Sequence, residues 1–234
     1  MTTTQPDTTL SAGSDAPVAL ALLEELVDAG KKVVAAGLSP GSSGNISARG
    51  GDGRVFITPG GSSLGALDPD RISVLSPDGE WLSGDRPSKE VGLHLAFYRK
   101  NPTHHAVVHV HSAQAVAASC VLPWSESSAL PPLTPYFVMR AGQTPLVPYR
   151  APGSAELGTL LLAIDHPFSS ALLQNHGQVT SARSLSGAID AAIEVEEASR
   201  ITLITAGQDR RLLTDDEISE LTERYGSDWT LVNR

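Results

Sequence analysis

A short apolar run that carries two histidines constrains the fold of this chain more than any other stretch. Residues 106–112 read Ala-Val-Val-His-Val-His-Ser, a run rich in β-branched residues and of the length of a strand. Side chains alternate along a strand, so His109 and His111 are expected to leave one face with their imidazoles side by side. Two histidines at this spacing supply half of a metal site, or else form a hydrogen-bonded pair in the core.

The residues before this strand predict a short helix that brings a carboxylate towards the histidines. Pro87-Ser88 begins the helix and Asn101-Pro102 ends it. Glu90 falls in its first turn, and His94 follows one helical turn later. His94 could touch the same site as Glu90 or be a hydrogen-bonded helix histidine. The apolar face of the helix comprises Leu93, Ala96 and Phe97.

A third histidine lies further along the chain. His176-Gly177 follows the short apolar run 169–173, and the glycine is expected to let the chain turn so that the histidine points inward. An ion of the zinc kind takes three protein ligands and keeps one position open for chemistry. The sequence therefore predicts a metal site made of His109, His111 and His176, with Glu90 beside it.

Two loops rich in glycine and serine precede this region, at 37–45 and 58–63. Glycines expose backbone N–H groups, and serine and asparagine add donors, so such loops can cradle a phosphate. They can equally be simple turns. The residues of interest in them are Asn45, Gly60 and Gly61.

The rest of the chain alternates between strand-like and helical segments. We expect strands at 46–49, 54–58, 71–76, 80–82 and 145–149, and helices at 14–37, 112–121, 154–163, 184–205 and from 215 onward. The first helix is expected to be core structure, and the acidic residues Glu194, Glu196 and Glu197 to form a solvated face. This alternation indicates an α/β fold with a mixed sheet in one domain, residues 16–234, after a disordered tail at 1–15.

Composition excludes several classes of function. The net charge of −9, without clusters of Lys and Arg among aromatic residues, argues against nucleic-acid binding. No apolar run approaches the twenty residues that span a bilayer, and the N-terminus has no targeting pattern, so we expect a soluble cytoplasmic protein with no membrane partner. The single cysteine, Cys120, fits a reducing compartment and is expected to be a small buried hydrophobe.

Five motifs occur here in the order found in the class II aldolase/adducin family, which the chain resembles from about Val18 to Glu223. They are GNISAR at 44–49, ITPGG at 57–61, PSKE at 87–90, HVH at 109–111 and QNHG at 174–177. The stretches at 79–90, 134–142 and 145–149 look closest to the branch of 3-oxo-tetronate 4-phosphate decarboxylases.

The resemblance implies a three-layer α/β/α sandwich with a mixed, mostly antiparallel central sheet, commonly assembled as a homotetramer with sites near subunit boundaries. It implies Zn²⁺, or another divalent metal such as Mn²⁺ or Co²⁺, on the three histidines. Glu90 would act as the general acid/base and could also ligate the metal, and Tyr136 would be a second proton donor. Tyr136 could instead be a half-buried strand residue.

Two departures from the aldolases of the family bear on the substrate. Asn45, Gly60, Gly61 and Ser88 correspond to the family's phosphate site, but Gly60-Gly61 stands where aldolases usually have Thr-Gly. Lys89 stands where they typically have serine, between Ser88 and Glu90. A lysine there is either a solvated surface charge or a cation that recognises a substrate carboxylate or phosphate.

The function that the resemblance implies is metal-dependent decarboxylation of a small phosphorylated sugar acid. A 3-oxo-tetronate 4-phosphate would lose CO2 through a metal-stabilised enediolate and give dihydroxyacetone phosphate. The alternative is a sugar-phosphate aldolase of the fuculose-phosphate type, which would release an aldehyde. A non-catalytic adducin-like interaction module is a third possibility, although it would have no need of Glu90 and the three histidines together.

Overall fold

Eight strands form one mixed sheet at the centre of the computed structural model, which describes residues 15–230. The strand order is β4-β3-β2-β1-β5-β8-β7-β6, and every neighbouring pair is antiparallel except β6 and β7. The strands are β1 (Asn45–Arg49), β2 (Val55–Ile57), β3 (Ser73–Leu75), β4 (Trp81–Ser83), β5 (Ala106–Val110), β6 (Leu146–Val147), β7 (Ser170–Leu173) and β8 (Gly177–Ala182).

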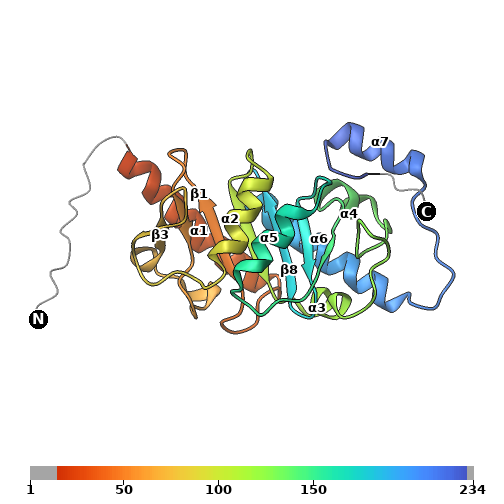
Figure 1. Cartoon of the computed structure of the whole chain (residues 1–234), viewed down its shortest axis with the longest axis horizontal. Coiled ribbons are helices and arrows are strands. Elements are labelled where there is room, and N and C mark those ends of the chain that lie inside the picture. The colour runs from red at the N-terminus through yellow and green to blue at the C-terminus, as the bar shows by residue number, and fades with distance from the viewer. Residues whose placement is uncertain (1–14, 231–234) are drawn as a thin grey trace, which may run out of the picture.

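Helices cover both faces of this sheet (Figure 1). One face packs against α1 (Asp15–Ala35) and α6 (Leu185–Ile204), and the other against α2 (Val91–Lys100) and α5 (Ala155–Ala163). Three further helices, α3 (Ala113–Ser119), α4 (Pro135–Arg140) and α7 (Asp215–Tyr225), lie towards the end of the sheet where β6 and β7 are found. This arrangement confirms the predicted α/β/α sandwich with a mostly antiparallel sheet.

The central strand β5 divides its side chains between the two apolar layers. Ala106, Val108 and Val110 join the cluster under α1 and α6, while Val107 joins the cluster under α2 and α5. Because strand side chains alternate, His109 shares the face of Val107 and points towards the start of α2. Because helices cover both faces of the sheet, both sets of side chains are buried, which explains the nearly continuous apolar sequence of the strand.

Each strand and helix expected from the sequence has a counterpart, but one strand and one α-helix were missed, as were two short 3-10 helices at Leu64–Ala66 and Pro69–Arg71. The strand β8 has the sequence GQVTSA, whose polar residues hide the strand pattern although its first five residues are buried. Most of their polar groups are paired inside the fold. The Gln178 amide NH2 donates to Ser112 Oγ at 2.7 Å, and the Thr180 hydroxyl donates to the Ala188 carbonyl at 2.8 Å. Gln178 Oε1 is buried without a hydrogen-bond partner among the described residues. The helix α4 was missed as well, although Thr134 caps it and Pro135 opens it.

The prediction that Cys120 is buried was wrong. Cys120 is exposed, and its sulfur accepts a hydrogen bond from the Asn175 amide at 3.2 Å. The first helix, α1, contributes Leu26, Ala29 and Val33 to the core, while its Leu20 and Val34 are exposed. The predicted tail at 1–15 falls almost wholly outside the described residues, except that Asp15 is the first residue of α1.

Glu196 does not belong to a solvated acidic face. Its two carboxylate oxygens accept hydrogen bonds from the backbone N–H groups of Gln114 and Ala115, at 2.9 and 2.8 Å. These are first-turn donors of α3, whose N-cap residue Ser112 makes no side-chain cap bond. The hydroxyl of Ser112 accepts from Gln178. A carboxylate from α6 therefore caps the helix that begins directly after His111.

We predict that Glu196→Ala lowers the free energy of unfolding by about 1–2 kcal/mol, because two helix N–H groups lose their charged acceptor. Urea unfolding followed by circular dichroism measures the change. The control is Glu197→Ala, which removes an exposed partner of Arg200 and is expected to cost less than about 0.5 kcal/mol. Equal losses in the two variants would contradict the capping role.

Candidate metal centre and substrate cavity

His109 and His111 lie on one face at the end of β5. His109 is fully buried, and its Nδ1 donates to the Gln178 carbonyl of the neighbouring strand at 2.8 Å. Because Nδ1 carries the proton in the neutral ring, Nε2 presents its lone pair to the site. His111 lies one residue past the end of the strand, and its Nε2 is 3.0 Å from Nε2 of His109. The predicted side-by-side pair is present.

His176 comes from the turn between β7 and β8. Its ring centroid is 5.0 Å from that of His109 and 4.7 Å from that of His111. The turn depends on Asn175, which adopts a left-handed φ of 56°, whereas we expected Gly177 to supply this freedom. Gly177 is required for a different reason, since a Cβ at that position would lie 2.6 Å from the Val110 carbonyl oxygen.

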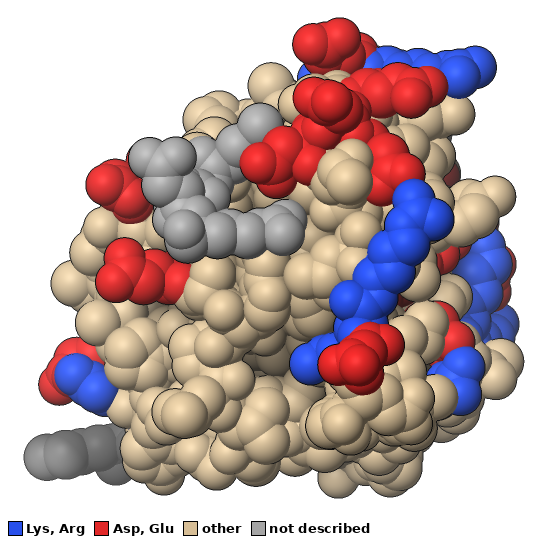
Figure 2. Space-filling model, turned by 90° about the vertical axis from the view of Figure 1, so that its right-hand side faces the viewer, with Lys and Arg blue, Asp and Glu red and all other residues tan. Residues whose placement is uncertain are grey.

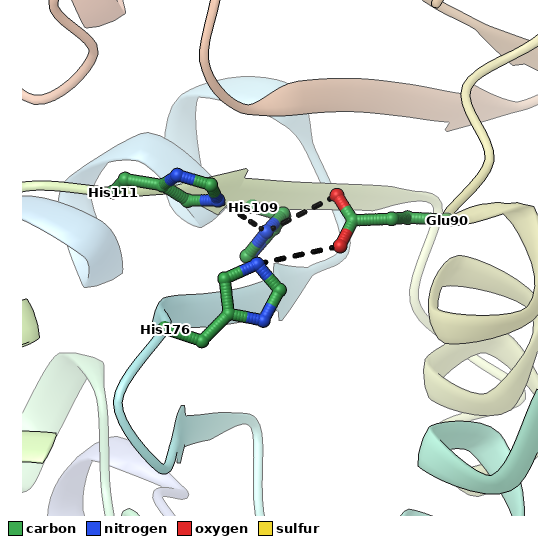
Figure 3. Close-up of side chains that lie close together, drawn as sticks. All are labelled: Glu90, His109, His111 and His176. Carbon is green, nitrogen blue, oxygen red and sulfur yellow. Dashed lines mark hydrogen bonds and ion pairs between the residues drawn. The ribbon is translucent and has the colours of Figure 1, made fainter. Parts of the chain in front are cut away.

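Glu90, the N-cap residue of α2, completes the group (Figure 3). Its Oε2 is 3.3 Å from Nε2 of His109, and its Oε1 is 3.4 Å from Nε2 of His176. The Asn45 side-chain amide donates to Oε2 at 2.8 Å. The carboxylate is only 5% exposed, so these neighbours replace its water.

The protonation states suit a cation site. Burial and the neighbouring His109 lower the pKa of His111 and of His176 to about 4, which leaves both rings neutral near pH 7. Burial by itself would raise the pKa of the Glu90 carboxyl, but His109, Asn45 and His176 together hold it well below its ordinary value. The cluster therefore places an ionised carboxylate beside the neutral rings of His111 and His176.

The spacing of these groups fits a divalent ion. Their ligand atoms all lie within 4.8 Å of one another, and the separations of 3.0, 3.3 and 3.4 Å bracket the ~3.3 Å edge expected for nitrogen and oxygen ligands in tetrahedral sites. Oε1 of Glu90 and Nε2 of His176 are buried without a hydrogen-bond partner among the described residues. A cation would satisfy both atoms, and the bond from His109 to Gln178 fixes the ring as a metal-binding histidine requires.

A cavity of about 560 Å³ opens beside this cluster. It brings together every residue predicted for substrate binding, namely Asn45, Gly60, Gly61, Ser88 and Lys89. The segments that carry Gly60-Gly61 and Ser88-Lys89 are joined by the bridge between Pro59 and Pro87, and Asn45 is the first residue of β1. The aliphatic part of Lys89 lies against Gly153, where a Cβ would be 3.1 Å from Lys89 Cγ.

Sequence reasoning missed Arg86, which also lines the cavity. Its place one residue before the PSKE motif was the available signal, because that motif already carried Ser88 and Glu90. Asn45 was predicted to bind substrate phosphate. It lines the cavity, but its amide NH2 already donates to the Glu90 carboxylate.

Tyr136 is not among the residues that line this cavity. It belongs to α4, is 56% exposed, and has the Arg140 guanidinium 5.4 Å from its ring centre. The alternative of a half-buried strand tyrosine is therefore wrong. A role as proton donor remains a prediction, and it would have to act across a subunit boundary.

The comparison with known families agrees with this site. Residues 24–203 match the family described as Class II Aldolase and Adducin N-terminal domain. The chain belongs to the class II aldolase and adducin family. All four residues of the candidate metal centre fall within the matched range.

Curated relatives are similar over nearly their whole length. The 3-oxo-tetronate 4-phosphate decarboxylase of Escherichia coli (strain K12) is 44% identical over 206 residues, which cover 88% of this chain and 97% of the relative. The decarboxylase of the same name from Pectobacterium atrosepticum is 43% identical over 198 residues, or 85% and 91%. A 5-methylthioribulose-1-phosphate/5-deoxyribulose-1-phosphate aldolase of Rhodospirillum rubrum is 32% identical over 209 residues, or 88% and 91%.

Solved structures share the fold. The crystal structure of YgbL from Escherichia coli superposes with a TM-score of 0.83 at 43% identity, covering 87% of this chain and 99% of that one. An L-fuculose 1-phosphate aldolase gives a TM-score of 0.77 at 25% identity, covering 92% and 98%.

The surface charge and the helix hydropathy bear on two of the expectations from the sequence. On the face drawn in Figure 2, single Lys and Arg side chains stand among Asp and Glu, without a continuous basic surface. Among the described residues, no helix has the length and apolar character of a membrane span.

We predict that His109→Ala, His111→Ala and His176→Ala each lose the bound divalent metal, because two remaining histidines compete poorly with water. Elemental analysis of the purified proteins measures the metal, expected at about one ion per chain in the wild type. The control is His105→Ala, an exposed histidine that lies outside the cluster. A variant that keeps full occupancy would remove that histidine from the ligand set.

Proposed function

We propose that this protein decarboxylates a 3-oxo-tetronate 4-phosphate to dihydroxyacetone phosphate and CO2. The observation that carries this proposal is the name shared by relatives that are 42–44% identical over most of the chain. The site is consistent with it, because Glu90 and the three histidines stand at one end of a cavity that also holds Lys89 and Arg86.

The bond to be broken joins the carboxylate to the carbon beside the ketone. When that bond breaks, its electron pair moves towards the ketone oxygen and leaves an enediolate. A divalent ion held by His109, His111 and His176 would supply a Lewis acid for this negative charge. The carbon that lost CO2 then takes one proton, which gives the hydroxymethyl group of the product.

Glu90 is the group that we assign to the proton transfer. It is buried and adjacent to the histidines, so a proton that reaches it from the solvent would pass to carbon from within the cavity, which restores the carboxylate. The Asn45 amide, which donates to Oε2, leaves Oε1 without a hydrogen-bond partner among the described residues. Oε1 is therefore the oxygen that we expect to carry the proton.

Two cationic side chains line the cavity and could bind a substrate that carries both a carboxylate and a phosphate. Lys89 lines the cavity together with His111 and His176, which supports a position for its ammonium at the histidine end. Arg86 lines the cavity together with Gly60 and Gly61. We assign the carboxylate, which neighbours the reacting carbon, to Lys89, and the phosphate to Ser88 and the backbone of Gly60-Gly61.

An aldolase is the second candidate. The relative from Rhodospirillum rubrum that is 32% identical is named as an aldolase of sugar phosphates, and the same enediolate chemistry would release an aldehyde in place of CO2. The test is one assay with 3-oxo-tetronate 4-phosphate and a parallel assay with 5-deoxyribulose 1-phosphate. We expect CO2 and dihydroxyacetone phosphate from the first. Cleavage of the second substrate alone would favour the aldolase.

We further propose Zn²⁺ as the metal, with Mn²⁺ or Co²⁺ as alternatives, a homotetrameric assembly and a cytoplasmic location. Three histidine nitrogens and a carboxylate are ligands that zinc accepts readily. The assembly is proposed from the family resemblance, and the location from the single cysteine, Cys120, which fits a reducing compartment.

We predict that Glu90→Gln lowers kcat by about a hundredfold or more while much of the metal stays bound, because the amide cannot carry the proton. Steady-state kinetics and elemental analysis on the same preparation measure the two quantities. The control is Glu80→Gln, an exposed glutamate in the turn before β4. Wild-type turnover in Glu90→Gln would assign the proton transfer elsewhere, with Tyr136 as the next residue to test.

We predict that Lys89→Ser lowers kcat/KM for the keto acid by a factor that corresponds to about 1.5–3 kcal/mol, since a charged hydrogen bond to the substrate disappears. Metal content should stay unchanged. The matched control is Lys31→Ser, an exposed lysine of α1 paired with Asp28. Unchanged kinetics in Lys89→Ser would show that this ammonium is a solvated charge and does not select the substrate.

A further inference from the structure

A buried chain of hydrogen bonds runs from Glu90 away from the cavity. Asn45 Nδ2 donates to Glu90 Oε2 at 2.8 Å, and Asn45 Oδ1 is 2.5 Å from Nε2 of His94. Nδ1 of His94 is 2.7 Å from the Ser47 hydroxyl, which is 2.8 Å from the hydroxyl of Tyr98. All five side chains are buried, and only Glu90 and Asn45 line the cavity.

This series of hydrogen bonds forms because side chains on one face of α2 and side chains on one face of β1 repeat at similar distances. Glu90, His94 and Tyr98 are four residues apart along α2, so they share one helix face and advance about 6 Å per step. Asn45 and Ser47 are two residues apart along β1, so they share one sheet face and advance about 6.6 Å. Each strand side chain therefore reaches its helix neighbours in turn. The Arg49 guanidinium, 4.9 Å from the centre of the Tyr98 ring, continues the series.

The direction of every hydrogen bond in the chain is determined. A carboxylate only accepts, so the Asn45 amide must turn its NH2 group to Glu90 and its oxygen to His94. That oxygen also only accepts, so Nε2 of His94 must carry the proton. The remaining ring nitrogen of a neutral imidazole accepts from Ser47, whose oxygen accepts from Tyr98. Each group thus donates towards Glu90.

The surroundings keep His94 in this neutral form. It is completely buried, and burial followed by the nearby His109 lowers its pKa to about 3. A neutral ring with a fixed tautomer presents one donor and one acceptor in fixed directions. The Asn45 amide consequently cannot rotate by 180°, because its NH2 group would then face the donor of His94 and its oxygen would face the carboxylate.

We propose that His94 is a positioning residue, whose Nε2–H holds the Asn45 amide so that the amide fixes the Glu90 carboxylate among the three histidines. This inference rests on the proposed role of Glu90 in the reaction. His94 does not line the cavity, and the side-chain hydrogen bonds that link it to Glu90 pass through Asn45. It binds no substrate.

The first test is the tautomer of His94 in the wild-type protein without substrate. Nitrogen-15 NMR of labelled histidines is expected to show a neutral ring with its proton on Nε2 from pH 5 to pH 8. A proton on Nδ1 would reverse the chain and overturn the proposal. Because no substrate is present, this result is independent of which reaction the enzyme catalyses.

The second test compares His94→Phe with His94→Gln. Phenylalanine fills the space but gives Asn45 no donor, so we expect kcat to fall by about ten- to a hundredfold, with KM within about threefold and metal content near the wild-type value. Glutamine can donate to Asn45 and is expected to restore most of the loss. The matched control is His104→Phe, which removes a half-buried histidine bonded to Ser181 and should leave kcat unchanged.

Wild-type kcat in a folded His94→Phe protein would overturn the proposal, and so would a glutamine variant no better than the phenylalanine variant. If His94→Phe does not fold, the wild-type tautomer and the kinetics of His94→Gln decide. If the wild-type enzyme proves to be an aldolase, the same kcat comparison is made with the aldol substrate, which separates this proposal from the choice of reaction.

Discussion

The register between β1, β5 and β8 is the constraint on which the site depends. Asn45 pairs with His109 across β1 and β5, and His109 pairs with Val179 across β5 and β8. A slip of one residue on β5 would turn both histidines into the layer under α1 and α6 and expose valines to the cavity. The register is set by the apolar residues that alternate with the histidines, so core packing and site geometry are specified by the same five-residue strand.

Much of the site followed from this alternation, and the errors have physical reasons. The pair His109 and His111 was predictable because a strand leaves little freedom in where its side chains point. The strand β8 was missed because it buries Gln178 and Thr180, whose hydrogen bonds to α6 and the start of α3 exist only in the folded protein. The capping role of Glu196 was missed for the same reason, since a contact between distant helices has no local pattern.

Other features came only through the family resemblance. The spacing of Gly60-Gly61 and Ser88 does not by itself indicate a common cavity, because their meeting depends on the bridge between Pro59 and Pro87. The exposed position of Tyr136 on α4 was not predicted, because that helix was not identified from the sequence. Cys120 was assigned to the core from its apolar neighbours, but α3 ends at Ser119, and the chain then leaves the core.

The metal centre also joins parts of the chain that are far apart in sequence. Glu90 begins a helix, His109 and His111 end a strand, and His176 lies in a turn much later in the chain. An ion that binds these ligands where the folded chain brings them together, and not in the unfolded chain, would stabilise the folded state by its binding free energy. If the site binds an ion as proposed, the resistance of this protein to heat and denaturant would depend on metal availability. A chelator would act on it as a mild denaturant, even in the absence of any substrate.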